Sequence, residues 1–169
     1  HSQVAANTQD VLGSLPRSSR QKPCSIYDVN HLGLSLYYDS IANAGSMLGV
    51  GSVIVMDDTT GMVKTLTRLA HVYYDESCGQ CTPCREGTGW LYRMLQRILD
   101  GNGKEEDLDL LLTVGEKIMG NTICALGDAA ATPVESFIKH FRDEFEYYIQ
   151  NGKSMVEEEH NLIEEAASV

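Results

Sequence analysis

A loop that holds three cysteines at three-residue spacing is the feature that most constrains this chain. Residues 78–87 read Cys-Gly-Gln-Cys-Thr-Pro-Cys-Arg-Glu-Gly, directly before a helical pattern. Two overlapping Cys-x-x-Cys units let one tight turn aim three sulfurs at one centre. A fourth ligand must come from elsewhere, and Cys124 is the candidate because its loop of small residues lets backbone approach a bulky inorganic core. Four thiolates, here Cys78, Cys81, Cys84 and Cys124, are the ligand set of a [4Fe-4S] cluster.

Two other uses of these cysteines compete with the cluster. Zinc also takes four cysteines, but structural zinc sites usually draw one Cys-x-x-Cys pair from each of two knuckles, so a three-plus-one division favours iron and sulfur. A thioredoxin-like exchange site needs one Cys-x-x-Cys at the start of a helix inside a βαβ unit. The third thiol and the missing βαβ pattern argue against exchange. Both alternatives stay open at the level of the sequence.

Three residues of the loop are expected to tune the cluster without binding it: Gly79, Thr82 and Arg85. Gly79 and the loop amides can point N–H groups at the sulfurs. Because a thiolate-ligated cluster is negatively charged, Arg85 and the N-terminus of the following helix should both raise its reduction potential. The alternative for Arg85 is a solvated cation at the start of a helix.

Charge and composition limit the classes of partner that this chain can bind. A net charge of -11 and a pI near 4.7 repel nucleic acid and anionic membrane surfaces, which favours a protein or a small redox carrier. No apolar stretch is long enough to span a bilayer. Five cysteines, three of them in one loop, do not resemble a secreted disulfide framework, and no signal segment is recognisable. The expected compartment is the cytoplasm, or the cytoplasmic or matrix face of a membrane complex.

The first part of the chain carries weak structural signals. Residues 1–24 show no helical or strand period, and we expect an irregular arm. Within residues 25–58, the alternation at 32–38 is typical of an edge strand, a short helix is predicted to follow, and 53–56 is the clearest strand. These elements look like half of a small α+β unit. They are too few for an independently stable sheet.

From residue 59 onward the pattern is helical. Apolar residues recur with a 3.6-residue period in four segments, and we assign these stripes to the core. The fourth helix is predicted to begin at Thr132-Pro133-Val134-Glu135, which offers a cap hydroxyl, a proline at the first helical position and a capping-box glutamate. The stripes lie within residues 62–73, 90–99, 108–119 and 134–149.

Four amphipathic helices with short joints predict a mainly α fold, an antiparallel four-helix bundle over residues 59–152. The two cysteine-bearing loops follow the first and third helices, so both should lie at one end and bring Cys124 to the other thiols. Residues 153–169 are expected to form a solvated or weakly helical acidic tail. Core or interface roles, and not electron relay, are expected for Tyr73, Tyr74 and Trp90. Residues not assigned to metal are Cys24, His71 and His160.

Two segments resemble one protein family. Residues 76–87, ESCGQCTPCREG, and 119–128, MGNTICALGD, closely resemble the flavin-and-iron-sulfur subunit, or F-type subunit, of NADH:quinone oxidoreductase, the respiratory complex I. The resemblance runs from about Tyr38, through AGSMLG at 44–49, to about Ile149. Related diaphorase subunits of NAD-linked hydrogenases and formate dehydrogenases share the cysteine loop.

The resemblance implies an electron-transfer role. The family's subunit passes a hydride pair from NADH to FMN, and its [4Fe-4S] cluster takes electrons singly from the flavin toward further iron-sulfur clusters and quinone. The implied partners are the flavin-bearing portion and neighbouring iron-sulfur subunits of an NADH dehydrogenase, in the respiratory chain. The competing function is a non-redox helical assembly module that binds zinc or no metal.

One part of the family pattern is missing. Family members carry an FMN- and NADH-binding domain with a Gly-Arg-Gly-Gly-type loop before this region, and residues 1–40 hold nothing of that kind. FMN and NAD are therefore expected only on a missing domain or a partner chain, and no catalytic residue is assigned. By the same resemblance, residues 25–58 would be the remnant of a ubiquitin-like domain.

Overall fold

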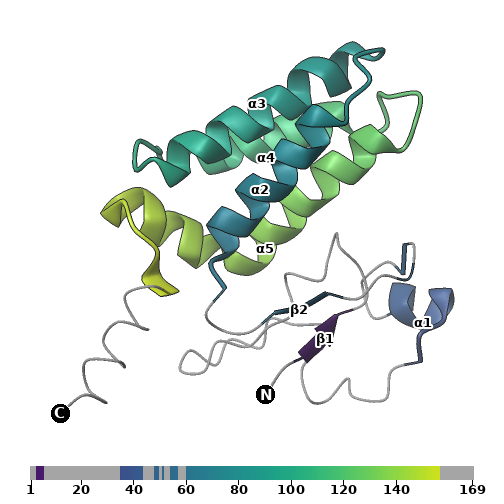
Figure 1. Cartoon of the computed structure of the whole chain (residues 1–169), viewed down its shortest axis with the longest axis horizontal. Coiled ribbons are helices and arrows are strands. Elements are labelled where there is room, and N and C mark those ends of the chain that lie inside the picture. The colour runs from purple at the N-terminus through teal and green to yellow at the C-terminus, as the bar shows by residue number, and fades with distance from the viewer. Residues whose placement is uncertain are drawn as a thin grey trace. The chain divides into compact units, whose positions relative to one another are not determined.

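The computed structural model describes residues 3–5, 35–43, 48–49, 51, 54–56 and 60–156. The chain divides into two units, residues 1–60 and 61–169 (Figure 1). The elements in chain order are β1 (Gln3–Ala5), α1 (Tyr38–Asn43), β2 (Ile54–Met56), α2 (Met62–Asp75), α3 (Thr82–Leu99), α4 (Glu106–Ile118) and α5 (Leu126–Asn151).

In the first unit, β1 and β2 pair antiparallel, with Val4 opposite Val55. The strand predicted at 53–56 is confirmed for β2. The irregular arm predicted for residues 1–24 is wrong at β1, because the partner that makes these residues a strand lies about fifty residues later and no local pattern reveals it. The predicted edge strand at 32–38 is also wrong where it can be followed, since 35–37 are not in a strand and Tyr38 begins α1. Cys24 lies outside the described residues.

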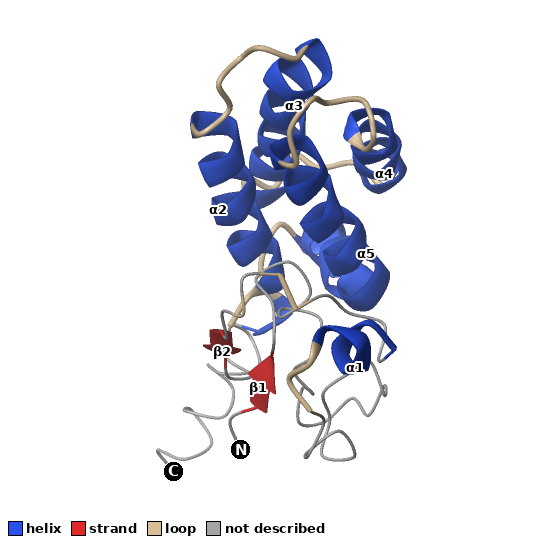
Figure 2. Ribbon diagram, turned by 90° about the vertical axis from the view of Figure 1, so that its right-hand side faces the viewer, coloured by secondary structure: helices blue, strands red, loops and turns tan. Residues whose placement is uncertain are grey.

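In the second unit, α2 to α5 pack side by side. Helix α3 contacts the other three, and α5 contacts α2 and α4 (Figure 1). The connections are short, so successive helices alternate in direction, and the mainly α prediction is confirmed. The α2–α3 and α4–α5 connections consequently lie at the same end of the helices, as Figures 1 and 2 show. No helix in the described ranges is long and apolar enough to cross a membrane.

The core is built from one buried stripe on each of these helices. Trp90 is 52% exposed, so the core role expected for it is wrong, while the interface role stays a prediction. The reason is angular: Trp90 lies about 100° around α3 from the buried Leu91, outside the face that packs on the other helices. Tyr74 is also exposed, at 39%. The largest fully buried side chains of this unit include Met62, Leu66, Leu91, Leu95, Ile98, Leu108, Leu111, Ile118, Phe137, Ile138 and Phe145.

The start of α5 differs from its prediction. The helix begins at Leu126, and Pro133 lies inside it. The Thr132 hydroxyl donates to the Asp128 carbonyl at 2.8 Å, a bond within the helix, and therefore does not cap its start. Residues 126–131 include three alanines, the best helix formers, and Ala130 and Ala131 are buried, so packing extends the helix past the local capping signal.

The starts of α2 and α4 are each held by a carboxylate that also involves another helix. Gly61 precedes α2 and has no side chain to cap it, but the Met62 N–H donates to Glu144 Oε1 of α5 at 2.9 Å. At the start of α4, the buried Asp107 carboxylate accepts the Lys104 N–H at 2.8 Å and pairs with Arg97 of α3. Glu144 thus caps α2 from α5, whereas Asp107 caps its own helix and ties it to α3 through Arg97.

The beginning of the predicted solvated tail is packed. Ser154 and Val156 are buried, and the Val156 N–H donates to Ser154 Oγ at 3.3 Å. A Cβ at Gly61 would meet Ser154 Oγ at 3.6 Å, which places Ser154 beside the start of α2. The acidic residues from 157 onward lie outside the described residues.

Candidate metal centre

Four cysteines from two separate segments line one cavity of about 130 Å³ at the loop end of the helices. Cys78 and Cys81 come from the α2–α3 loop, Cys84 from the first turn of α3, and Cys124 from the α4–α5 loop. The Ile123 N–H lies 3.4 Å from Cys81 Sγ and links the two segments across 42 positions of sequence. Cys84 is 7% exposed, whereas Cys78 and Cys124 are exposed, so the cavity is closed on one side and open on the other.

Local backbone geometry explains how one short loop presents three thiols. Gly79 has φ +77°, a left-handed conformation that glycine adopts without strain, and it turns the chain between Cys78 and Cys81. Cys81 is then the N-cap of α3, and Pro83 sits in the first turn, where a missing N–H is no loss. The Arg85 N–H closes this turn on the Cys81 carbonyl at 2.9 Å.

Two helix N-termini lie at the cavity. Helix α3 starts at Thr82, directly after Cys81, and α5 starts at Leu126, which itself lines the cavity. Each N-terminus carries partial positive charge and free N–H groups, so both favour a negatively charged occupant. The sequence pattern did not reveal the second one, because its capping signal places the start of the fourth helix at Thr132. The alanines that follow Cys124 were the available signal.

The residues expected to tune the site lie around it. Arg85 Nη1 donates to the Gly79 carbonyl at 3.1 Å, and Nε donates to Glu86 Oε1 at 2.9 Å. Arg85 therefore holds the cysteine loop through the Gly79 carbonyl, and Glu86 neutralises part of the Arg85 charge. Thr82 is exposed. None of Gly79, Thr82 and Arg85 is among the residues that line the cavity.

Two polar residues at the site were not singled out from the sequence. Ser77 Oγ lies 3.2 Å from Cys84 Sγ, and Glu76 lines the cavity. Both directly precede the first cysteine, so their position in the motif was the available signal. The Thr88 hydroxyl donates to the Cys84 carbonyl at 2.7 Å, which holds the backbone of the buried cysteine within α3.

The arrangement of the thiols around the cavity helps to distinguish a single metal ion from a cluster. A single tetrahedral zinc with bonds of about 2.3 Å needs its sulfurs within about 4 Å of one another. Among the residues that the structure describes, no three side chains of His, Cys, Asp or Glu converge closely enough to hold one metal ion. Thiolates that surround a cavity suit a cluster, because each can bind a different iron. His71 pairs instead with Asp75 at 3.3 Å.

Comparison with known proteins identifies the family. Residues 64–148 match the family model of the NADH-ubiquinone oxidoreductase-F iron-sulfur binding region. The chain belongs to this family. Proteins of the family bind a [4Fe-4S] cluster, and the cysteines at the cavity are chemically suited to it.

Relatives within the family match only over part of their length. The chain is 53% identical to the F-type subunit of NADH-quinone oxidoreductase from Rickettsia typhi over 114 residues, 68% of this chain and 27% of that protein. It is 54% identical to the same subunit of Rickettsia bellii over 113 residues, which cover 67% of this chain and 27% of that protein. The chain thus spans about a quarter of the length of the curated relatives it matches.

Two solved structures of an NAD⁺-reducing [NiFe]-hydrogenase are also similar. The H2-reduced structure has a TM-score of 0.57 and 34% identity and covers 60% of this chain and 17% of the hydrogenase chain. The air-oxidised structure has a TM-score of 0.63 and 25% identity, and the match covers 87% of this chain and 23% of the hydrogenase chain. Both likenesses support the helical arrangement described above.

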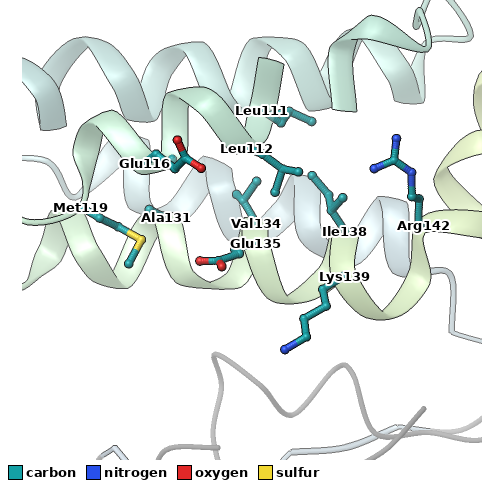
Figure 3. A pocket seen from close by; sticks show the side chains of 11 residues that line it. Leu111, Leu112, Glu116, Met119, Ala131, Val134, Glu135, Ile138, Lys139 and Arg142 are labelled. Carbon is teal, nitrogen blue, oxygen red and sulfur yellow. The ribbon is translucent and has the colours of Figure 1, made fainter. Parts of the chain in front are cut away.

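A second hollow, of about 310 Å³, lies between α4 and α5 and shares no lining residue with the cysteine cavity. Figure 3 shows its lining, with Val134 and Ile138 among its apolar residues and Glu135 and Lys139 among its charged ones. Arg142 at its margin donates to Glu146 at 2.8 Å, and this bond raises the pKa of the guanidinium above its ordinary value. Its mixed charges favour no particular ligand.

Proposed function

We propose that this chain holds a [4Fe-4S] cluster on Cys78, Cys81, Cys84 and Cys124 and serves electron transfer in an NADH dehydrogenase. The observation that carries the proposal is the cavity that these four cysteines share, although Cys124 is separated from the others by two helices. When bound, such a cluster accepts and releases one electron at a time, at a potential that the surrounding protein sets. Zinc is the weaker candidate because three of the cysteines come from one segment and one from another, whereas structural zinc sites usually draw a pair from each of two segments.

The chain's own residues supply the holding and the electrostatics. The cysteine thiolates would hold the metal, and the Ile123 N–H would donate to the Cys81 sulfur. The N-termini of α3 and α5 would stabilise the negative charge of the site. Arg85 would keep the loop in shape through the Gly79 carbonyl, with a smaller effect of its charge because Glu86 lies against it.

The electron donor and acceptor are proposed from the relatives. The NADH-quinone oxidoreductase subunits and the NAD⁺-reducing hydrogenase are both named for reactions of a nicotinamide cofactor. FMN would lie on another part or chain and supply single electrons, and further iron-sulfur clusters would take them toward quinone. The exposed side of the cysteine cavity, at Cys78 and Cys124, is the face where such partners can come close. The complex would be peripheral, at the cytoplasmic or matrix face of the respiratory membrane.

For residues 25–58 we propose a partial ubiquitin-like segment, the part of the family's domain that precedes the helical region. Support comes from the helix α1, whose Ile41 is fully buried, and from β2, which pairs antiparallel with another strand.

The function is tested by measuring iron and acid-labile sulfide per chain in anaerobically purified protein and by recording EPR spectra before and after reduction with dithionite. About four of each, with a signal that appears on reduction, are expected. Cys124→Ala should leave three thiolates and a labile cluster, whereas Cys24→Ser, the matched change at the remaining cysteine, should leave the iron content unchanged. Zinc or no metal in strictly anaerobic protein would refute the electron-transfer role.

A further inference from the structure

The hydroxyl of Ser77 lies against the most buried sulfur of the metal centre. Ser77 Oγ is 3.2 Å from Cys84 Sγ, a normal length for a hydrogen bond to sulfur. Ser77 is half-buried and directly precedes the first cysteine of the loop, while Cys84 is 7% exposed. The pair thus joins the residue before the cysteine loop to the last cysteine within it.

The direction of this bond follows from the chemistry of the sulfur. Between a free thiol and a hydroxyl, either atom could donate. A metal-bound cysteine sulfur has no proton, so only the Ser77 hydroxyl can donate. The inference therefore rests on the proposed function, in which Cys84 is a ligand.

We infer that Ser77 is a positioning residue that raises the reduction potential of the centre by donating a hydrogen bond to the Cys84 sulfur. Adding an electron makes the thiolate sulfurs more negative, so a donor to sulfur stabilises the reduced form more than the oxidised form. The burial of Cys84 strengthens this difference, because water screens the bond less there than at Cys78 or Cys124.

Ser77 can be separated from the other groups that act on the centre. The Ile123 N–H to the Cys81 sulfur belongs to the backbone and survives any side-chain change. Arg85 donates to a loop carbonyl and to Glu86. Removing the Ser77 hydroxyl alone therefore leaves those contacts, both helix N-termini and all four cysteines in place.

The experiment is a redox titration of the full chain, purified anaerobically and followed by EPR, with iron and sulfide measured on every sample. Ser77→Ala should make one-electron reduction about tenfold less favourable, a midpoint about 59 mV more negative. Ser77→Thr keeps the hydroxyl and should retain the wild-type midpoint. Thr113→Ala is the control, because its hydroxyl lies on the exposed side of α4 and bonds the Asp109 carbonyl. It should change nothing.

A second measurement reports on the bond itself. After exchange into D2O, pulsed EPR of the reduced wild type should detect an exchangeable deuteron coupled to the cluster that Ser77→Ala lacks and Ser77→Thr retains. The midpoint is the potential at which half of the clusters are reduced, so it does not depend on the fraction of chains loaded.

Three results would overturn the inference. A Ser77→Ala midpoint equal to that of the wild type, with the cluster intact, refutes the tuning role alone. Complete loss of iron from Ser77→Ala makes the serine an assembly residue. A wild-type chain without an iron-sulfur cluster refutes the proposed function and this inference together.

Discussion

The same substitution at two glycines should have opposite effects on stability. Gly87 in α3 and Gly115 in α4 are both buried in helix interiors. A Cβ at Gly87 would lie 2.7 Å from both Cδ1 and Cγ1 of Ile118. A Cβ at Gly115 would have Ala131 Cβ as its nearest neighbour, at 3.8 Å, an ordinary contact. Helix propensity treats the two positions alike, so only packing distinguishes them.

The magnitudes follow from these distances. Replacing glycine by alanine in a helix interior raises the free energy of unfolding by about 1 kcal/mol. At Gly115 no contact opposes this gain, so Gly115→Ala should raise the free energy of unfolding by about 1 kcal/mol. At Gly87 the new methyl group overlaps two atoms of Ile118, which is 1% exposed, and such overpacking costs about 1–3 kcal/mol. Gly87→Ala should therefore lower the free energy of unfolding by about 0–2 kcal/mol.

Urea unfolding followed by far-UV circular dichroism, on chains with equal iron content, measures both values. A double-mutant cycle identifies the cause. Ile118→Ala alone should cost about 2–5 kcal/mol, because it leaves a cavity, but it should cost less in the Gly87→Ala background, where the new methyl group fills part of the space.

Two results would refute the reasoning. Equal stabilisation by Gly87→Ala and Gly115→Ala would mean that α3 and α4 do not approach as closely as described. Additivity of Gly87→Ala and Ile118→Ala within about 0.5 kcal/mol would mean that the two side chains do not meet.

Two further predictions concern single carboxylates. Glu144→Ala removes the cap of α2 and should lower the free energy of unfolding by about 2 kcal/mol in the same urea assay, whereas Glu146→Ala, which breaks a surface pair with Arg142, should change it by less than about 1 kcal/mol; equal effects would contradict the cap. Glu76→Gln removes a negative charge beside the cysteine cavity and should raise the midpoint potential by some tens of millivolts, opposite in sign to the Ser77 change. A fall in the midpoint would contradict this placement.

The sequence predicted helices best where their apolar residues follow a regular local period. Met62, Val63, Leu66 and Ala70 of the α2 stripe are buried as expected. Helix α3 ends at Leu99, just before Gly101, which has φ +76°. Such signals act within a few residues, through side-chain spacing and through the φ angles that glycine permits. The meeting of the cysteine loops was predictable for a related reason, since short connections force neighbouring helices to alternate in direction.

The errors arose where a distant partner outweighed a local signal. Thr132 and Pro133 look like a helix start, yet burial of Ala130 and Ala131 carries α5 back to Leu126. The three residues of β1 carry no strand signal of their own and are a strand only because β2 pairs with them.

The candidate donor set, the family resemblance and the two loops that carry the cysteines can be read from the amino-acid sequence, because they depend on residue types at fixed spacing. Three other features appear only in the packed helices: α5 points a second N-terminus at the site, Glu144 caps a helix 82 residues away, and Ser77 faces the buried sulfur. Each of these depends on the distance between groups on different turns or elements. That distance is fixed only when the helices pack.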